Sequence, residues 1–373
     1  MSSFWVCNIA SMGLYIGNPT NVIVAQANNI NVLEYTKLMG IPTLVACILA
    51  FLIALALFWK SIPQFIDPPS LSPSDYAVED VVGAWFGSVC LGASLVLLMT
   101  MPLVVSNLSV WILTLPFAAI VLLRTILVDV IPRASSPSTN EPETLTISAP
   151  SHFIQSTTAE EAAGGSSEFL VMDQRESETQ TTADKLSPSR AFKALKTRFP
   201  RTTTLLARLP MNLVPFTFGM FILVETLTSR GWTSLLATAL AKVSYSRASA
   251  IFAIGGIATL ACNALNNLPM TILFTRALGH PNFIAGIQAY TSDTVQRQKE
   301  AQFALVVGAN LGANVLYLGS LAGIMWIDLV LRRYKVQGIN QWKFFRWCMV
   351  VTPVVLAGAC GVLLAEMGSS AFV

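Results

Sequence analysis

The hydrophobic positions of this chain fall into long uncharged runs that are separated by short polar stretches. Crossing about 30 Å of hydrocarbon takes about 20 helical residues, and runs of that length recur along the chain. The predicted spans lie at about 41–58, 81–103, 108–131, 209–227 and 347–365. The pattern therefore predicts an all-α polytopic membrane protein.

Two further apolar stretches are interrupted by glycine and asparagine, and the two interruptions resemble each other. Residues 8–18 are Asn-Ile-Ala-Ser-Met-Gly-Leu-Tyr-Ile-Gly-Asn, and residues 310–320 are Asn-Leu-Gly-Ala-Asn-Val-Leu-Tyr-Leu-Gly-Ser. At a constant offset they share an asparagine, a leucine–tyrosine pair and a glycine. Half-helix ends at such breaks can face a solute near the bilayer midplane, so we predict the repeated broken helices of a transporter.

Residues 248–275 are also uncharged and contain the sequence Asn266-Asn267-Leu268-Pro269. Their length fits a single crossing, but a crossing would place the basic loop 332–346 on the opposite side from the basic segment 185–208. The positive-inside tendency argues against that arrangement. We therefore predict a re-entrant hairpin at about 248–279, which keeps both basic segments cytoplasmic and makes the two breaks an inverted repeat.

The order of these segments predicts two repeats and a linker. We expect residues 1–60 to hold the broken helix and span that end the first repeat. Residues 80–131 and 209–367 are expected to form the second repeat, which includes the hairpin, a broken helix at about 301–330 and the last span. Between them, residues 132–208 begin with a Ser-, Thr- and Glu-rich stretch that is nearly free of aromatic residues. That composition predicts a disordered cytoplasmic linker.

Several local features are also expected. Residues 228–247 should form a short polar and basic connection. Residues 31–35 and 340–345 resemble interfacial segments that precede a spanning helix. Asp129 and Arg133 stand four residues apart at the end of a predicted span, where the two side chains can form an ion pair on one helix face.

Composition supports the membrane assignment and excludes other classes. The chain is 54% hydrophobic and 12% charged, whereas about a quarter of the residues in soluble domains are charged. A net charge of +3 is too small to indicate a nucleic-acid partner. Six cysteines without a CxxC pair argue against a disulfide framework or zinc site. Both histidines, His152 and His280, lie in the linker and a loop, so Ser320 has no imidazole base, and no enzyme activity, metal or cofactor is predicted.

Four motifs stand in order along the chain and are spread over nearly all of it outside the linker. They are Ile16-Gly17-Asn18-Pro19-Thr20-Asn21, Pro215-Phe216-Thr217-Phe218-Gly219-Met220-Phe221, Asn266-Asn267-Leu268-Pro269-Met270-Thr271 and Gly308-Ala309-Asn310-Leu311-Gly312. In order and spacing they resemble the arsenite-permease branch of the ion-transporter superfamily, whose domain is citrate transporter-like. The resemblance implies that each repeat contributes a re-entrant hairpin and a broken helix that enclose the solute. The first hairpin and early scaffold helices are expected to be missing, as in a fragment, because the chain begins beside the first break.

The predicted solute site consists of amide, hydroxyl and backbone groups at the breaks and the hairpin tip. Such groups suit a polyhydroxylated or anionic solute. The candidate binding residues are Gly17, Asn18, Pro19, Thr20, Asn21, Asn263, Asn266, Asn267, Pro269, Thr271, Asn310, Asn314, Gly319 and Ser320. Glu225 is the candidate for ion coupling, because a carboxylate inside a membrane is a functional candidate by default. Close helix packing is the competing interpretation of the glycines and asparagines.

The resemblance implies a secondary transporter for a small oxyanion or neutral oxyacid of the arsenite or antimonite type, coupled to an ion gradient. Transport of a citrate-like carboxylate, sodium/proton exchange and a truncated, non-transporting remnant are the alternatives. The expected partners are membrane lipid, a small inorganic or organic anion, and a coupling proton or sodium ion. Assembly as a homo-oligomer and the choice between plasma and internal membranes stay open.

Overall fold

A computed structural model describes residues 2–62, 65, 78, 80–104, 110–131, 195–209, 211, 213–328 and 341–368. These residues are mainly helical and include no strand. Helices Val32–Phe58, Val81–Met101, Val110–Val130, Arg247–Leu265 and Gln341–Gly368 are long and apolar enough to cross a membrane. The prediction of an all-α polytopic membrane protein is confirmed.

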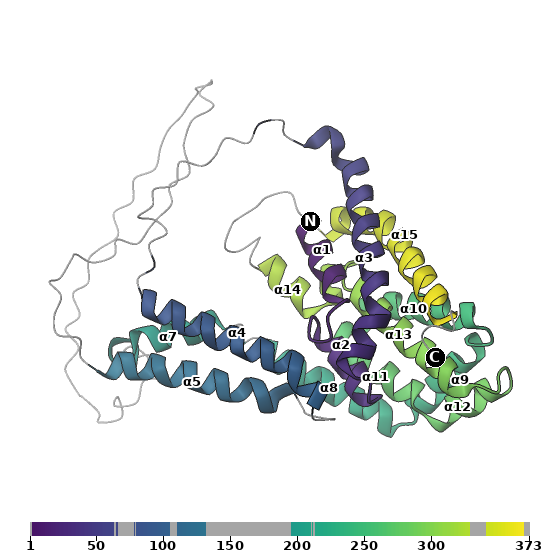
Figure 1. Cartoon of the computed structure of the whole chain (residues 1–373), viewed down its shortest axis with the longest axis horizontal. Coiled ribbons are helices and arrows are strands. Elements are labelled where there is room, and N and C mark those ends of the chain that lie inside the picture. Colours follow the sequence, from purple (N-terminus) through teal and green to yellow (C-terminus); the bar gives the residue numbers. More distant parts are fainter. Residues whose placement is uncertain are drawn as a thin grey trace, which may run out of the picture. The chain divides into compact units, whose positions relative to one another are not determined.

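The chain divides into two compact units, one formed by Met1–Val121 with Leu209–Val373 and the other by Leu122–Arg208. Most of the predicted linker and of the loop 332–346 lies outside the described residues. The labelled helices (Figure 1) are α1 Ser2–Ser11, α2 Pro19–Ala27, α3 Val32–Phe58, α4 Val81–Val104, α5 Val110–Val130, α7 Pro200–Arg208, α8 Leu213–Ser229, α9 Trp232–Val243, α10 Arg247–Leu265, α11 Asn267–Leu278, α12 Pro281–Gln288, α13 Thr294–Gly312, α14 Leu321–Asp328 and α15 Gln341–Gly368.

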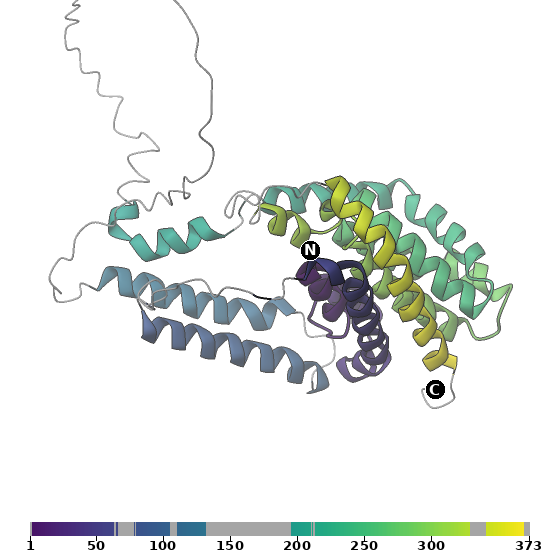
Figure 2. The same ribbon diagram turned by 90° about the horizontal axis from the view of Figure 1, so that it is seen from above.

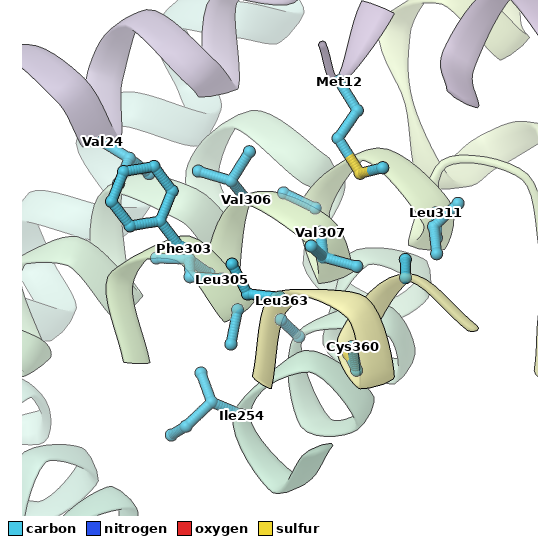
Figure 3. Close-up of a cluster of buried hydrophobic side chains, with 14 of the residues drawn as sticks. Met12, Val24, Ile254, Phe303, Leu305, Val306, Val307, Leu311, Cys360 and Leu363 are labelled. Atoms are coloured by element: carbon cyan, nitrogen blue, oxygen red, sulfur yellow. The ribbon is translucent and has the colours of Figure 1, made fainter. Parts of the chain in front are cut away.

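Helix α13 forms the centre of the first unit. Every residue from Ala301 to Gly312 is buried, as expected for a helix that is apolar on all sides. Side chains from α2, α10 and α15 surround its Phe303, Leu305 and Val307 (Figure 3). The glycines of α13 allow α10 to approach closely, since a β-carbon on Gly308 would lie 2.5 Å from the carbonyl oxygen of Gly255.

Helices α10 and α11 form the hairpin expected at about 248–279. They are joined at Asn266, whose φ is 67°. At the start of α10, Arg247 pairs with Glu300 on α13, and at the end of α11 the carbonyl of Leu278 accepts a hydrogen bond from Gln298. Both arms therefore meet the same end of α13, which we call the base, while the tip lies at the opposite end.

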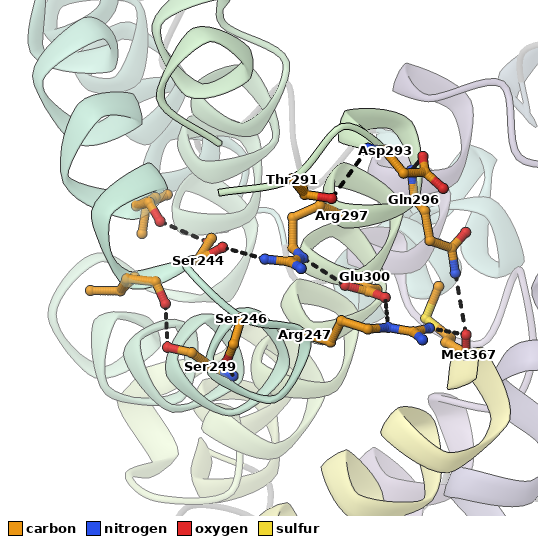
Figure 4. Close-up of polar contacts among 12 residues, drawn as sticks. Ser244, Ser246, Arg247, Ser249, Thr291, Asp293, Gln296, Arg297, Glu300 and Met367 are labelled. Carbon is orange, nitrogen blue, oxygen red and sulfur yellow. Dashed lines mark hydrogen bonds and ion pairs between the residues drawn. The ribbon is translucent and has the colours of Figure 1, made fainter. Parts of the chain in front are cut away.

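The base is held by a buried cluster of charges (Figure 4). The Glu300 carboxylate is completely buried and lies 2.6 Å from Nε of Arg247 and 3.0 Å from Nε of Arg297. Arg297 also donates to the carbonyl of Ser244, and Arg247 donates to the carbonyl of Met367 at the end of α15. Because a buried carboxylate is tolerated when its partners are in place, these contacts join α10, α13 and α15.

The prediction of a short polar connection at 228–247 is wrong, because this segment contains helix α9. This helix buries Thr233, Ala237, Leu240 and Ala241, which recur at the spacing of one helical face. The two interfacial segments are also not separate elements. Residues 32–35 and 341–345 form the first turns of α3 and α15, which pack against each other (Figure 2).

In the second unit, the side chain of Asp129 binds backbone N–H groups of α7. Its carboxylate oxygens accept hydrogen bonds from the backbone N–H groups of Arg201, at 3.3 Å, and Thr202, at 2.8 Å. Both donors belong to the first turn of α7, where N–H groups have no partner within the helix. The predicted partner Arg133 lies outside the described residues. Asp129 therefore caps α7.

Candidate functional site

The first break separates α1, which ends at Ser11, from α2, which begins at Pro19. Asn18 caps α2, because its Oδ1 accepts a hydrogen bond from the N–H of Thr20 at 3.2 Å. Proline suits the first helical position, where no N–H partner is needed. A β-carbon on Gly17 would lie 2.3 Å from the carbonyl oxygen of Ser11, so the break requires glycine there.

Asn21 replaces the backbone bonds that the break removes. Its Nδ2 donates to the carbonyl oxygens of Ser11, at 2.9 Å, and Leu14, at 3.0 Å. Carbonyls at a helix end have no partner within the helix, and this buried amide supplies one. Asn21 therefore stabilises the break and the start of α2 together.

The second break separates α13 from α14 and repeats this arrangement. Ser320 occupies the position that corresponds to Asn18, and its Oγ accepts a hydrogen bond from the N–H of Gly323 at 3.0 Å. Asn263 on α10 accepts from the N–H of Leu316 at 3.0 Å. A β-carbon on Gly319 would lie 2.9 Å from Oδ1 of Asn263. The sequence repeat is thus also a repeat of backbone structure.

Asn310 joins the two breaks. Its Oδ1 accepts from Nδ2 of Asn18, at 3.0 Å, and from Oγ of Ser11, at 3.1 Å. Its Nδ2 donates to Oδ1 of Asn21 at 2.7 Å and to the carbonyl of Val306 at 2.9 Å. Asn310 is completely buried, so these bonds satisfy an amide that water cannot reach.

The two broken segments run antiparallel. Near the base, Gln302 donates to Oδ1 of Asn28, and beyond the break Asn8 donates to Oδ1 of Asn314 at 2.8 Å. As the residue number falls from 28 to 8 in the first segment, that of its partner rises from 302 to 314. The breaks therefore face each other as expected for an inverted repeat.

The hairpin tip adds two buried acceptors without a donor. Nδ2 of Asn266 donates to the carbonyl of Leu318 at 3.1 Å, which holds the tip against the second break. Among the described residues, no donor reaches Oδ1 of Asn266 or Oδ1 of Asn267, although both atoms are buried. Pro269 and Thr271 are also buried, and the Thr271 hydroxyl donates to the carbonyl of Asn267 at 2.7 Å. Buried oxygens without a hydrogen-bond donor are normally satisfied, here by a donor or a cation from outside the chain.

The structure does not bring Glu225 to the breaks. It lies on α8, where its carboxylate pairs with Nη1 of Arg276 at 2.8 Å, and 67% of its side chain is exposed. Arg276 belongs to the last turn of α11, near the base of the hairpin. Within the described residues, no group of three His, Cys, Asp or Glu side chains could hold a metal ion.

Two groups of residues were missed by the sequence analysis. Asn8 and Ser11 stand in the repeated motif and could have been chosen from the repeat itself, because Asn8 corresponds to Asn310. The charges around Glu300 were placed outside the broken helix, which was expected to begin near 301. α13 in fact begins at Thr294, after a cap from Asp293.

Comparisons with known proteins find relatives that are named as membrane proteins. An arsenical pump membrane protein of Escherichia coli is 28% identical over 149 residues, which are 39% of this chain and 32% of that protein. A putative arsenical pump membrane protein of Bacillus subtilis (strain 168) is 25% identical over 153 residues, or 41% of this chain and 32% of that protein. The chain thus spans about a third of the length of these relatives. No solved structure matches.

The family comparison covers more of the chain. The profile of a family described as "Citrate transporter" matches residues 5–308, which include the first break and the hairpin. The match ends just before Asn310, the residue that joins the two breaks. Because the profile matches most of the sequence, the chain belongs to the citrate transporter family.

Proposed function

We propose that this protein is a secondary transporter that moves a small, hydroxyl-bearing oxyanion or neutral oxyacid across a membrane. The observation that carries the proposal is the pair of unsatisfied oxygens, Oδ1 of Asn266 and Oδ1 of Asn267, at the hairpin tip. Leaving a buried acceptor without a donor costs about 1–3 kcal/mol. A solute with O–H groups offers the donors that both oxygens need.

The surroundings of the tip support the same solute class. The first turn of α11 begins directly after Asn266, and Asn18 and Ser320 mark the starts of two further helices at the breaks. Helix N-termini favour negative charge. A solute that carries both O–H groups and oxygen lone pairs can therefore meet the tip and the helix ends together.

Two solute types remain within this class. The relatives named arsenical pumps make arsenite and antimonite the first solutes to test. The family description favours a citrate-like hydroxycarboxylate as the second. For coupling, a sodium ion would also satisfy the carbonyl oxygens of Asn266 and Asn267, since hard cations prefer oxygen ligands. If protons drive transport instead, the side-chain oxygens of Asn266 and Asn267 bind the solute alone.

Vesicles that contain the full chain provide the test. Asn267→Ala and Asn310→Ala are each expected to abolish uptake of arsenite and citrate while membrane abundance stays normal. Gln288→Ala, which removes an exposed amide at the other end of α12, is the control and should transport as the unmodified chain does. Collapsing the proton gradient and the sodium gradient separately identifies the coupling ion. Undiminished uptake in both site variants would rule the proposal out.

A further inference from the structure

A cavity lies at the base of the hairpin, away from the breaks. Its volume is about 480 Å³. It is lined by the C-terminal ends of α2, α8 and α11 and by the N-terminal ends of α9 and α12. The residues that matter for its chemistry are Asn28, Gly231, Thr233, Thr275, Arg276 and His280.

The electrostatics of this basal cavity favour an anion. Arg276 contributes a guanidinium whose contacts with described residues, Glu225 and Thr228, both involve Nη1. The remaining guanidinium N–H groups are therefore available to a ligand. Nδ1 of His280 accepts from the N–H of Asn282 at 3.1 Å, so Nε2 is the nitrogen that can donate.

Two helix N-termini add to the positive potential. α9 begins at Trp232, directly after Gly231, whose φ of 81° suits glycine and which provides no side-chain cap. α12 begins at Pro281, which has no N–H group, and the N–H of Asn282 is already bonded to His280, so this helix contributes its dipole alone. Unpaired N–H groups at the start of a helix carry partial positive charge and bind anions.

A buried side chain without a partner also points to a ligand. Thr275 is 6% exposed and lines the cavity, and no described residue forms a hydrogen bond with its hydroxyl. A buried hydroxyl of this kind is normally satisfied. A small polar molecule in the cavity would supply the missing bond.

Polar residues connect this cavity with the hairpin tip. Asn267, Thr271 and Thr275 recur at every fourth position of α11, so they share one face of the helix, and all are buried. The distance from Asn267 to Arg276 along the helix is about 13 Å. α2 packs beside α11 and extends from Asn21 at the first break to Asn28 at the cavity.

From these features we propose that the basal cavity is an entry site that binds the solute as an anion before it passes along α11 to the breaks. The inference rests on the proposed function and narrows the class of solute that the protein would carry. The tip requires O–H donors, whereas the entry site requires negative charge. Together they select a partly protonated oxyanion or a hydroxycarboxylate over uncharged arsenous acid.

Glu225 has a defined part in this inference. Its carboxylate occupies Nη1 of Arg276 and competes with an incoming anion for the same charge. Removing the carboxylate should therefore strengthen anion binding, and removing Arg276 should weaken it. A residue that serves packing alone would not give these opposite effects.

Equilibrium dialysis of labelled citrate against the purified full chain in detergent, at low ionic strength, tests the entry site. Asn267→Ala is included in every sample, so that the site at the hairpin tip contributes less. In this background Arg276→Gln is expected to weaken citrate binding about tenfold or more, which corresponds to losing a hydrogen bond to a charged group. Glu225→Gln should tighten binding severalfold. Lys242→Gln, the same charge change at the far end of α9, should leave it within about twofold.

The transport arm separates this inference from the proposed function. In vesicles, Arg276→Gln should raise KM for citrate without changing kcat and should leave arsenite uptake unaltered. If the unmodified chain transports neither solute, the proposed function fails, while dialysis still decides whether the entry site exists. Absence of citrate binding in the Asn267→Ala background, or equal binding after Arg276→Gln, overturns the entry site.

Discussion

Replacing Glu300 by glutamine should destabilise the protein more than any other single change at the base. The carboxylate is fully buried, and Arg297, whose side chain is 9% exposed, would lose its charged partner. Breaking a buried ion pair by removing one member costs about 3–5 kcal/mol. Arg247 contributes less to this loss, because 40% of its side chain is exposed and water can replace the carboxylate.

The control lies on the same helix turn. Lys299 pairs with Glu34, and each side chain is 30% exposed. Lys299→Met should therefore cost no more than about 1 kcal/mol. Unfolding of the purified chain in mixed detergent micelles, followed by circular dichroism, gives both free energies. A double variant, Glu300→Leu with Arg297→Leu, should recover part of the loss, because no buried charge of that pair remains.

The reasoning would be refuted if Glu300→Gln shifted the unfolding midpoint no further than Lys299→Met. It would also fail if the double variant were as unstable as the sum of the two single changes. Either result would mean that water reaches the cluster in the folded protein.

Two further predictions concern backbone structure. Gly17→Ala places a β-carbon 2.3 Å from the Ser11 carbonyl oxygen, so we expect it to displace the first break and abolish vesicle uptake, whereas Gly40→Ala, where nothing lies within 4 Å, should retain it. Normal uptake by the first variant would show that the break is not rigid. Asp129→Ala removes the cap of α7 and should destabilise that helix by about 0.5–2 kcal/mol. Hydrogen exchange of the first-turn amides measures the effect, and unchanged protection would contradict it.

Much of the fold was predictable because hydrophobic runs and charge asymmetry are local properties of a sequence. The hairpin was predicted on the assumption that two basic segments lie on one side of the membrane, although its length alone fitted a crossing. α9 was missed because its apolar face is interrupted by polar residues, so hydropathy did not distinguish it from a loop. The start of α13 was misplaced because charged residues normally end a span, and the burial of Glu300 depends on Arg247, which is far away in the sequence.

The proximity of the two breaks was predicted in outline through the repeat. Asparagines that break a helix twice at matching positions identify both segments, and the structure places Asn18, Asn21 and Asn310 in one hydrogen-bonded group. The hydrogen-bond partner of each amide could not be deduced from the sequence, because it depends on the antiparallel packing of the two segments. The position of Glu225 beside Arg276 likewise depends on how α8 lies against α11.

The hairpin is fastened differently at its two ends. At the base, ionised groups of Arg247 and Glu300 hold it, whereas at the tip the neutral amides of Asn263 and Asn266 form the hydrogen bonds to the second break. A neutral hydrogen bond contributes about 0.5–1.5 kcal/mol net, far less than a buried ion pair loses when it is broken. A local opening of the hairpin would therefore begin at the tip, because its neutral hydrogen bonds cost less to break than the ion pairs of the base.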